Sequence, residues 1–223
     1  MSPPAEPCQI DFAGERLTLL PERAVWWPAS QTLFIADLHL GKAATYRSLG
    51  QPVPGGSTQE NLARLDRLMT SLAPQRLVFL GDFLHGARGR SNELFAAVEQ
   101  WCAKWPGLVR TLVRGNHDKR AGDPPGSLGF ELVDEPHLLG RLAACHHPQR
   151  HVTHAVLAGH LHPTIKLHGR GRDSLRMPCF VREGDALLIL PAFGEFTGGW
   201  PVERHPDRRF YGVGAQAVWA LPA

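Results

Sequence analysis

The chain has 223 residues, of which 43% are hydrophobic and 20% are charged, and its formal net charge is +3. This composition excludes a disordered chain and a membrane-embedded one, and the length fits a single globular domain spanning 1–223. Because the net charge is small, any affinity for nucleic acid must come from a local basic patch.

The N-terminus and the cysteines indicate the compartment. Residues 1–11 contain prolines and acids where a secretory signal would have a basic start and an apolar run. No apolar stretch approaches the roughly 20 residues that cross a bilayer. The four cysteines are widely spaced and form no CxxC pair, so neither a disulfide framework nor a thiolate metal site is expected. We therefore expect a cytoplasmic protein with reduced thiols and no membrane partner.

Hydrophobic patterning predicts strands that alternate with helices along the chain. Segments 16–20 and 25–27 predict a hairpin at the edge of a sheet. An amphipathic helix is expected at 59–72, where apolar residues recur every three or four positions, and a second helix at 93–104. Apolar runs predict strands at 32–36, 76–80, 108–113, 139–145 and 155–158, with more strands within 180–191 and 210–221. The alternation indicates an α/β protein.

Polar residues of metal-binding type follow five of these strands, at the point where each strand ends. The five blocks are Asp37-x-His39, Gly81-Asp82, Gly115-Asn116-His117-Asp118, Cys145-His146-His147-Pro148 and Gly159-His160-x-His162. Ligands of α/β sheets gather at the carboxyl ends of strands, so we expect these side chains to lie close together. Carboxylate, imidazole and amide donors without thiolates suit manganese, iron or zinc.

In this order the blocks resemble the signature of the calcineurin-like metallophosphoesterase superfamily, D-x-H, G-D, G-N-H-[DE], H and G-H-x-H. The resemblance implies an α/β sandwich of two mixed β-sheets packed face to face and flanked by helices. It also implies two divalent metal ions, with Mn²⁺ favoured and iron or zinc as alternatives. The first ion would be held by Asp37, His39 and His162, the second by Asn116, His146 and His160, and Asp82 would bridge both.

Two such ions, roughly 3.5–4 Å apart, would clamp a phosphate and turn a shared water into hydroxide near neutral pH. That hydroxide would attack phosphorus in line with the leaving oxygen. By the same resemblance His117 faces the phosphate, where it stabilises charge or protonates the leaving group, and Asp118 supports this neighbourhood.

The residue type at position 85 distinguishes subfamilies of this superfamily. Protein phosphatases typically carry G-D-x-x-D-R-G, whereas the block here is Gly81-Asp82-Phe83-Leu84-His85. This variant resembles the G-D-[LF]-x-H block of repair nucleases related to the bacterial SbcD subunit. His85 would then contact the scissile phosphate or its leaving group, and the alternative is a histidine that packs beside the site.

The sequence around the blocks resembles one bacterial group, the ligase-associated DNA damage response endonucleases (PdeM). The similarity includes Leu40-Gly41-Lys42-Ala43 after the first block and the segment 190–199 near the C-terminus. It implies a manganese-dependent phosphodiesterase that cuts single-stranded DNA or RNA in DNA repair, associated with a DNA ligase and a helicase. Two alternatives stay open: an enzyme acting on small nucleotides, and a scaffold without activity.

Several residues have a structural alternative beside the functional one. The family pattern favours a histidine two positions before proline, so the resemblance implies His146 and not His147 as the metal ligand. Lys42 and Arg47 either contact phosphates that flank the cut or are solvated loop charges. For most of the basic run we expect a solvated face, and for the tryptophans packing in the core or at an edge. These residues are Lys166, Arg170, Arg172 and Arg176, and Trp26, Trp27 and Trp200.

Overall fold

The computed structural model describes residues 6–53, 55–169 and 173–222. Its first sheet has seven strands, side by side in chain order: β1 (Cys8–Phe12), β2 (Glu15–Leu20), β3 (Ala24–Trp27), β4 (Thr32–Ile35), β5 (Arg76–Leu80), β6 (Val109–Val113) and β7 (Phe130–Val133). From β1 to β4 each strand is antiparallel to its neighbour, whereas β4 to β7 are parallel. β4 is buried along its whole length, as its continuous apolar sequence predicts.

The second sheet has nine strands: β8 (His137–Leu139), β9 (Leu142–Ala144), β10 (Ala155–Ala158), β11 (Pro163–His168), β12 (Ser174–Glu183), β13 (Leu187–Ile189), β14 (Trp200–Pro201), β15 (Arg208–Val213) and β16 (Val218–Ala220). Their order in space is β14-β11-β12-β13-β10-β9-β8, and β15 pairs with both β12 and β16. Strand β10 pairs in parallel with β9 and β13, while β12 is antiparallel to β13. Both sheets are therefore mixed.

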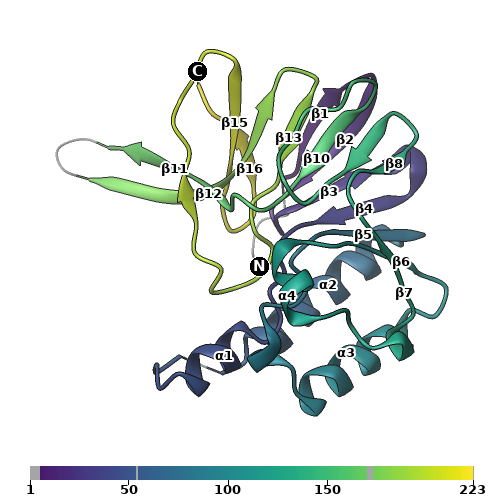
Figure 1. Cartoon of the computed structure of the whole chain (residues 1–223). Coiled ribbons are helices and arrows are strands. Elements are labelled where there is room, and N and C mark those ends of the chain that lie inside the picture. The colour runs from purple at the N-terminus through teal and green to yellow at the C-terminus, as the bar shows by residue number, and fades with distance from the viewer. Residues whose placement is uncertain (1–5, 54, 170–172, 223) are drawn as a thin grey trace.

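The two sheets pack face to face (Figure 1). Their inner faces form one core in which Phe34 and Val78 of the first sheet share a cluster with Leu157 and Phe180 of the second. The helices are α1 (Lys42–Ser48), α2 (Ser57–Leu72), α3 (Asn92–Lys104) and α4 (Asn116–Ala121), with short 3-10 helices at Pro28–Ser30, Ala87–Gly89 and Gly126–Leu128. α2 and α3 cover the outer face of the first sheet. The predicted sandwich is confirmed, with the described α-helices all on this side.

Both helices predicted from periodicity are present and begin slightly earlier than expected. α2 starts at Ser57, and its Leu65 and Leu68 are buried against the first sheet. α3 starts after Ser91, whose hydroxyl oxygen accepts a hydrogen bond from the Leu94 N–H at 3.1 Å. Such a side-chain cap satisfies one of the free N–H groups of the first turn, which explains the position of this helix start.

Two predicted strand arrangements are wrong in detail. The hairpin of β2 and β3 is not at the edge, because β1 pairs with β2 and forms the edge instead. The predicted strand at 139–145 is two antiparallel strands, β8 and β9, with Leu139 opposite Leu142. Gly140 has φ +58° in the two-residue turn between them. Glycine reaches positive φ without steric cost, so an apolar run can reverse direction there.

The remaining expectations from composition concern thiols and membranes. All four cysteines are free, as expected, and Cys102, Cys145 and Cys179 are buried. Among the residues that the structure describes, no helix combines the length and the apolar character needed to span a bilayer.

Candidate metal centre

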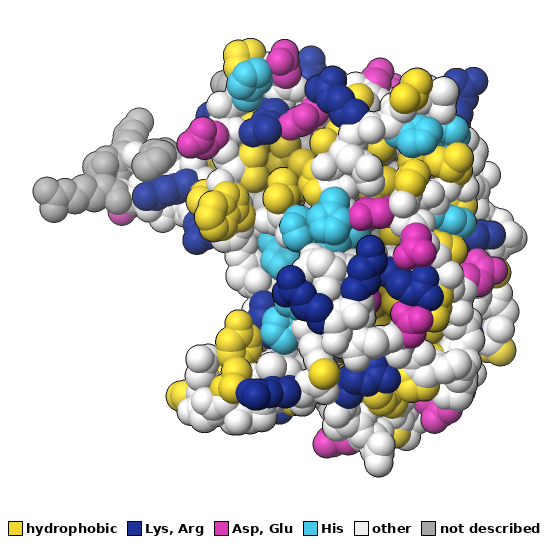
Figure 2. All heavy atoms as spheres, viewed as in Figure 1, with side chains coloured by type: hydrophobic (Ala, Val, Ile, Leu, Met, Phe, Trp, Pro, Cys, Tyr) yellow, Lys and Arg dark blue, Asp and Glu magenta, His cyan; other side chains and the backbone are white. Residues whose placement is uncertain are grey.

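The structure brings all seven predicted ligands together at the carboxyl ends of five strands. Asp37 and His39 follow β4, and Asp82 follows β5. Asn116 opens α4 after β6, His146 follows β9, and His160 and His162 follow β10. Figure 2 shows histidine side chains at the inner end of a hollow in the surface, between the lobe that carries α1 and the lobe that carries β11 and β12.

A first group of donor atoms lies around the ring of His39. Its Nε2 is 3.3 Å from Nε2 of His162 and 3.7 Å from Oδ2 of Asp82. Nε2 of His162 is also 3.5 Å from Oδ1 of Asp37. These residues come from the ends of three strands that are far apart in sequence, so this group depends on the pairing of β4 with β5 and on the packing of the two sheets.

A second group lies around the fully buried ring of His146. Its Nε2 is 2.9 Å from Oδ1 of Asn116, 3.0 Å from Nδ1 of His160 and 3.5 Å from Oδ1 of Asp82. Nδ1 of His146 is 3.1 Å from the carbonyl oxygen of Leu80. An Nδ1–H that donates to this carbonyl leaves the Nε2 lone pair directed at the other donors, as a metal ligand requires.

Asp82 connects the two groups. Its Oδ2 faces His39 and its Oδ1 faces His146, so one carboxylate presents one oxygen to each group. The two groups fit a pair of cations in their spacing, because donors at about 2.0–2.1 Å from an ion lie about 3 Å apart. They fit in charge as well, since Oδ1 of Asp37 is buried without any hydrogen-bond partner. A buried carboxylate oxygen of this kind requires a compensating charge.

Burial determines the protonation states of these residues in the metal-free protein. Removal from water, followed by the charge of the neighbouring Asp37 carboxylate, raises the pKa of Asp82 to about 8. Burial lowers the pKa of His146 to about 4, and it lowers the pKa of His39 and of His160. These three imidazoles are therefore neutral near pH 7 and can donate lone pairs. Asp82 keeps its proton at this pH in the metal-free protein, because its ionised form would lie beside the Asp37 carboxylate.

The backbone at the centre has a conformation that residues other than glycine rarely adopt. Five of the seven residues have positive φ, between +46° and +70°: Asp37, His39, Asp82, His160 and His162. Each residue in this region costs on the order of 1–3 kcal/mol, and such strain persists mainly at functional sites. These residues turn the chain sharply after β4, β5 and β10, which lets the ends of these strands direct their side chains into one volume.

Comparisons with known proteins agree with this geometry. A family model described as calcineurin-like phosphoesterase matches residues 30–143. This chain belongs to the calcineurin-like phosphoesterase family. It is therefore a metallophosphoesterase, a hydrolase whose family uses divalent metal ions, and the centre described above supplies donors for them.

Solved structures include one strong match. A Pseudomonas putida nuclease, MPE, has 46% sequence identity and a TM-score of 0.85, and the alignment covers 97% of this chain and 100% of that one. YfcE, a phosphoesterase from E. coli, has 17% identity and a TM-score of 0.42, with coverage of 84% and 95%. No curated protein sequence matches the chain.

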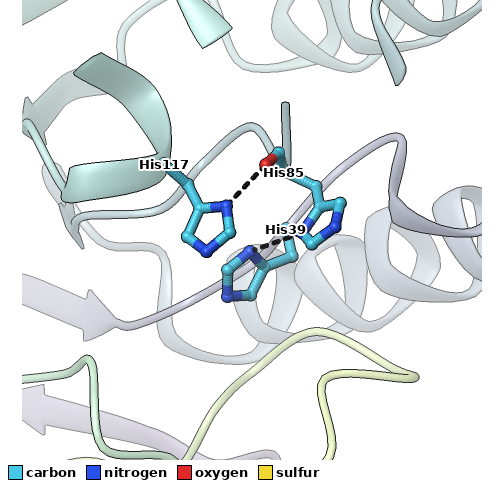
Figure 3. A group of neighbouring side chains, drawn as sticks. All are labelled: His39, His85 and His117. Atoms are coloured by element: carbon cyan, nitrogen blue, oxygen red, sulfur yellow. Dashed lines mark hydrogen bonds between the residues drawn. The ribbon is translucent and has the colours of Figure 1, made fainter. Parts of the chain in front are cut away.

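His117 and His85 lie beside the first donor group of this metallophosphoesterase (Figure 3). Nδ1 of His117 is 2.6 Å from the carbonyl oxygen of His85, which leaves its Nε2 free, 4.0 Å from Oδ2 of Asp82. The His85 ring stacks between the His117 ring, at a centroid distance of 4.9 Å, and the Tyr46 ring, at 5.9 Å. Burial, followed by the charge of Lys42, lowers the pKa of His85 to about 4.

Asp118 holds the loop after β5 against α4. Its side chain is fully buried and accepts hydrogen bonds from the backbone N–H groups of Gly115, Phe83 and Leu84 at 2.9–3.3 Å. The Phe83–Leu84 segment leads directly to His85. Asp118 therefore contacts the site through the backbone, and the supporting role expected for it stays a prediction.

The choice between His146 and His147 has a structural basis. Nδ1 of His147 is 2.6 Å from Oε1 of Glu135, and the backbone N–H groups of both histidines donate to Oε2 of Glu135. His147 still lies near His146 and His160 in a group that could hold an ion. Only the His146 ring, however, approaches Asn116 and Asp82. The geometry thus favours His146, the residue that the family resemblance implies, and its role as a ligand stays a prediction.

Sequence reasoning missed the residues that hold the loop at 193–199 against the centre. The buried Asn61 of α2 accepts from the Glu195 N–H, and Arg64 forms an ion pair with Glu195 and donates to the Phe193 carbonyl. The Thr197 carbonyl of this loop is 3.3 Å from Nδ1 of His162. Asn61 and Arg64 are ordinary polar residues of an amphipathic helix, so no local signal distinguishes them.

Among the basic residues, Lys42 is half-buried and donates to the Thr197 carbonyl at 3.2 Å, beside the centre. It is thus not a solvated loop charge. Lys166 and Arg176 are exposed, as expected. Arg170 and Arg172 lie outside the described residues.

A substitution at Gly81 would test how tightly the centre is packed. It has φ +78°, and an added Cβ would lie 2.2 Å from Nδ1 of His146. Gly14 has a similar φ of +81°, but its added Cβ would meet nothing within 4 Å. We expect Gly81→Ala to lower the free energy of unfolding by about 1–3 kcal/mol more than Gly14→Ala, the usual cost of overpacking. Gly81→Ala should also slow phosphodiester hydrolysis. Equal thermal unfolding and equal rates for the two variants would contradict this packing.

Proposed function

We propose that this metallophosphoesterase hydrolyses phosphodiester bonds of single-stranded DNA or RNA with two divalent ions, Mn²⁺ foremost. The observation that carries the proposal is the shared carboxylate of Asp82, with one oxygen toward the His39 group and the other toward the His146 group. The nucleic-acid substrate is supported by the 46% identity, over nearly the whole of both chains, to a protein described as a nuclease.

In this proposal each side chain has a defined task. Asp37, His39 and His162 would hold one ion, Asn116, His146 and His160 the other, and Asp82 both. Bound ions would polarise the phosphate and lower the pKa of a water molecule between them. The Leu80 and Thr197 carbonyls keep the rings of His146 and His162 oriented toward the donors.

His117 would act on the substrate directly. Its Nδ1 is engaged by the His85 carbonyl, and its Nε2 faces the centre. From that position Nε2 can donate to a phosphate oxygen or protonate the departing oxygen. The ring of His85 is stacked on His117 and would contact the phosphate or the leaving group from the side of α1.

A role in DNA repair, alongside a DNA ligase and a helicase, is the biological setting that we propose. It is supported by the resemblance of the blocks and of the segment 190–199 to ligase-associated endonucleases. Co-purification of the protein with a ligase and a helicase would test that association separately from the chemistry.

The activity is tested with metal-free protein and labelled oligonucleotides. Single-stranded DNA, single-stranded RNA and duplex DNA are incubated with a series of Mn²⁺, Fe²⁺ and Zn²⁺ concentrations, beside nucleoside monophosphates and cyclic nucleotides. We expect Mn²⁺-dependent cleavage of the single strands. If single strands stay intact while the small nucleotides are hydrolysed, the chain is instead a small-nucleotide phosphoesterase. If no ester is cleaved with any metal, the proposal fails.

A further inference from the structure

Two large aromatic side chains are exposed in the segment 194–200, beside the metal centre. Trp200 is 70% exposed and Phe196 is 48% exposed. Phe196 also has φ +59°, a region that bulky residues seldom occupy. Trp200 lies on the edge strand β14, but its side chain is exposed, so the expectation that it packs in the core or at an edge is wrong. Large apolar side chains exposed beside a polar site mark a binding surface.

The backbone at Trp200 is held by hydrogen bonds and close packing, although the Trp200 side chain is exposed. The backbone N–H of Trp200 donates to the carbonyl oxygen of His162 at 2.9 Å. This hydrogen bond places the tryptophan next to a predicted metal ligand. The preceding Gly199 packs so closely that an added Cβ would lie 2.2 Å from Cγ2 of Thr164. Arg176 donates to the Gly199 carbonyl and to Oγ1 of Thr164. A platform ordered in advance loses little conformational entropy when a ligand binds.

Trp200 and the centre line the same cavity. It has a volume of about 340 Å³ and is lined by His160, Leu161, His162, Thr197, Gly199 and Trp200. This size is within the range of small-molecule sites. Figure 2 shows hydrophobic side chains next to the histidines of the hollow. A phosphate at His160 and His162 would therefore place its attached nucleoside against the indole ring.

The charge around the cavity fits a phosphate chain. Lys42 donates to the Thr197 carbonyl on the cavity wall, so its ammonium group lies beside the centre. No ring contact of Trp200 with another aromatic side chain is present within 6–53, 55–169 and 173–222. Because 70% of Trp200 is exposed, much of its indole surface is available for a base. Aromatic stacking is the main sequence-tolerant way in which proteins hold unpaired bases.

We propose that Trp200 is the stacking platform for the nucleobase next to the scissile phosphate. This inference rests on the proposed function, and it gives a reason why the enzyme would cut single strands and not duplexes. A base in a duplex is already stacked and paired, so only an unpaired base can turn onto Trp200 while its phosphate reaches the histidines.

The test compares Trp200→Ala with Trp219→Ala, since Trp219 is the other strongly exposed tryptophan, at 48%, and lies on β16. Cleavage in Mn²⁺ is measured on a single-stranded oligonucleotide and on the same strand with abasic sites around the cut. The ratio of kcat/KM for the base-bearing strand to that for the abasic strand should fall about 5- to 150-fold in Trp200→Ala, the range for one stacked base. Trp200→Phe should keep most of this ratio, and Trp219→Ala should leave it unchanged.

A binding measurement separates stacking from an effect on turnover. In a His117→Ala background, fluorescence anisotropy should give a weaker Kd for the base-bearing strand with Trp200→Ala and no change for the abasic strand. The stacking role of Trp200 is wrong if wild-type protein cuts the base-bearing and the abasic strand equally well, or if Trp200→Ala preserves the ratio of their kcat/KM values. The proposed nuclease activity would stand in either case. If wild-type protein cuts no oligonucleotide, the proposed function itself has failed.

Discussion

Replacing His117 with alanine should lower kcat for oligonucleotide cleavage by roughly 10²–10⁴-fold, the usual contribution of a positioned acid–base group. The ring touches no donor of the second group, and its Nε2 is 4.0 Å from Oδ2 of Asp82, farther than the neighbouring ligand atoms. Both ions should therefore remain bound. Steady-state kinetics and metal analysis after gel filtration measure the two effects separately.

The matched control is His205→Ala, because His205 is an exposed histidine outside all five blocks. It should keep the wild-type rate and metal content. His117→Asn should be as slow as the alanine variant, since it cannot transfer a proton at neutral pH. If His117→Ala lost one ion, its assignment to the substrate would be wrong and the ring would be a ligand.

Asp82→Asn should weaken the binding of both ions by at least about 10²-fold, since even residues that only support a ligand contribute about 10–100-fold. The amide keeps the shape of the side chain and an acceptor for the His117 N–H at 2.8 Å, but it removes the charge that both groups share. Metal-dependent hydrolysis should be lost in parallel. Asp11→Asn, at an exposed aspartate on β1, should change neither.

Asp82→Asn weakens metal binding, but it should stabilise the fold of the metal-free protein at high pH. Burial and Asp37 raise the folded-state pKa of Asp82 to about 8 from 3.8, so between these values the folded protein keeps a proton that the unfolded chain has released. The free energy of unfolding of EDTA-treated wild type therefore falls as pH rises through this window. Asp82→Asn should remove that slope and melt above wild type at pH 9. A metal-free variant that melted below wild type at pH 9 would contradict the repulsion with Asp37.

Much of the centre could be predicted from local sequence. The apolar runs of β4 and β5 are long enough to be recognised as buried strands, and Asp37 and Asp82 follow them directly. Since parallel strands end at one edge of a sheet, position along the chain was sufficient to bring these carboxylates together. In the structure β4 and β5 pair in parallel with Ile35 opposite Phe79, so both strands end at the same edge of the sheet.

Weak local signals account for what was missed in the fold. Strand β1 lies in a proline-containing N-terminal segment and becomes a strand because Ile10 and Phe12 fill the core between the sheets. The apolar run at 139–145 carries no clear break except Gly140, and an isolated glycine does not by itself specify a turn. In both places long-range packing decided the structure.

The sequence by itself therefore determined the family, the order of the predicted ligands and the central strands, because these depend on short motifs and on continuous apolar runs. Only the tertiary structure decided that Asp82 faces both donor groups, that Arg64 holds the loop beside His162, and that Trp200 stands open to solvent at the centre. The physical reason is that each of these depends on contacts between residues far apart in the chain. Their direction and exposure follow from how the two sheets pack, and no local pattern records that packing.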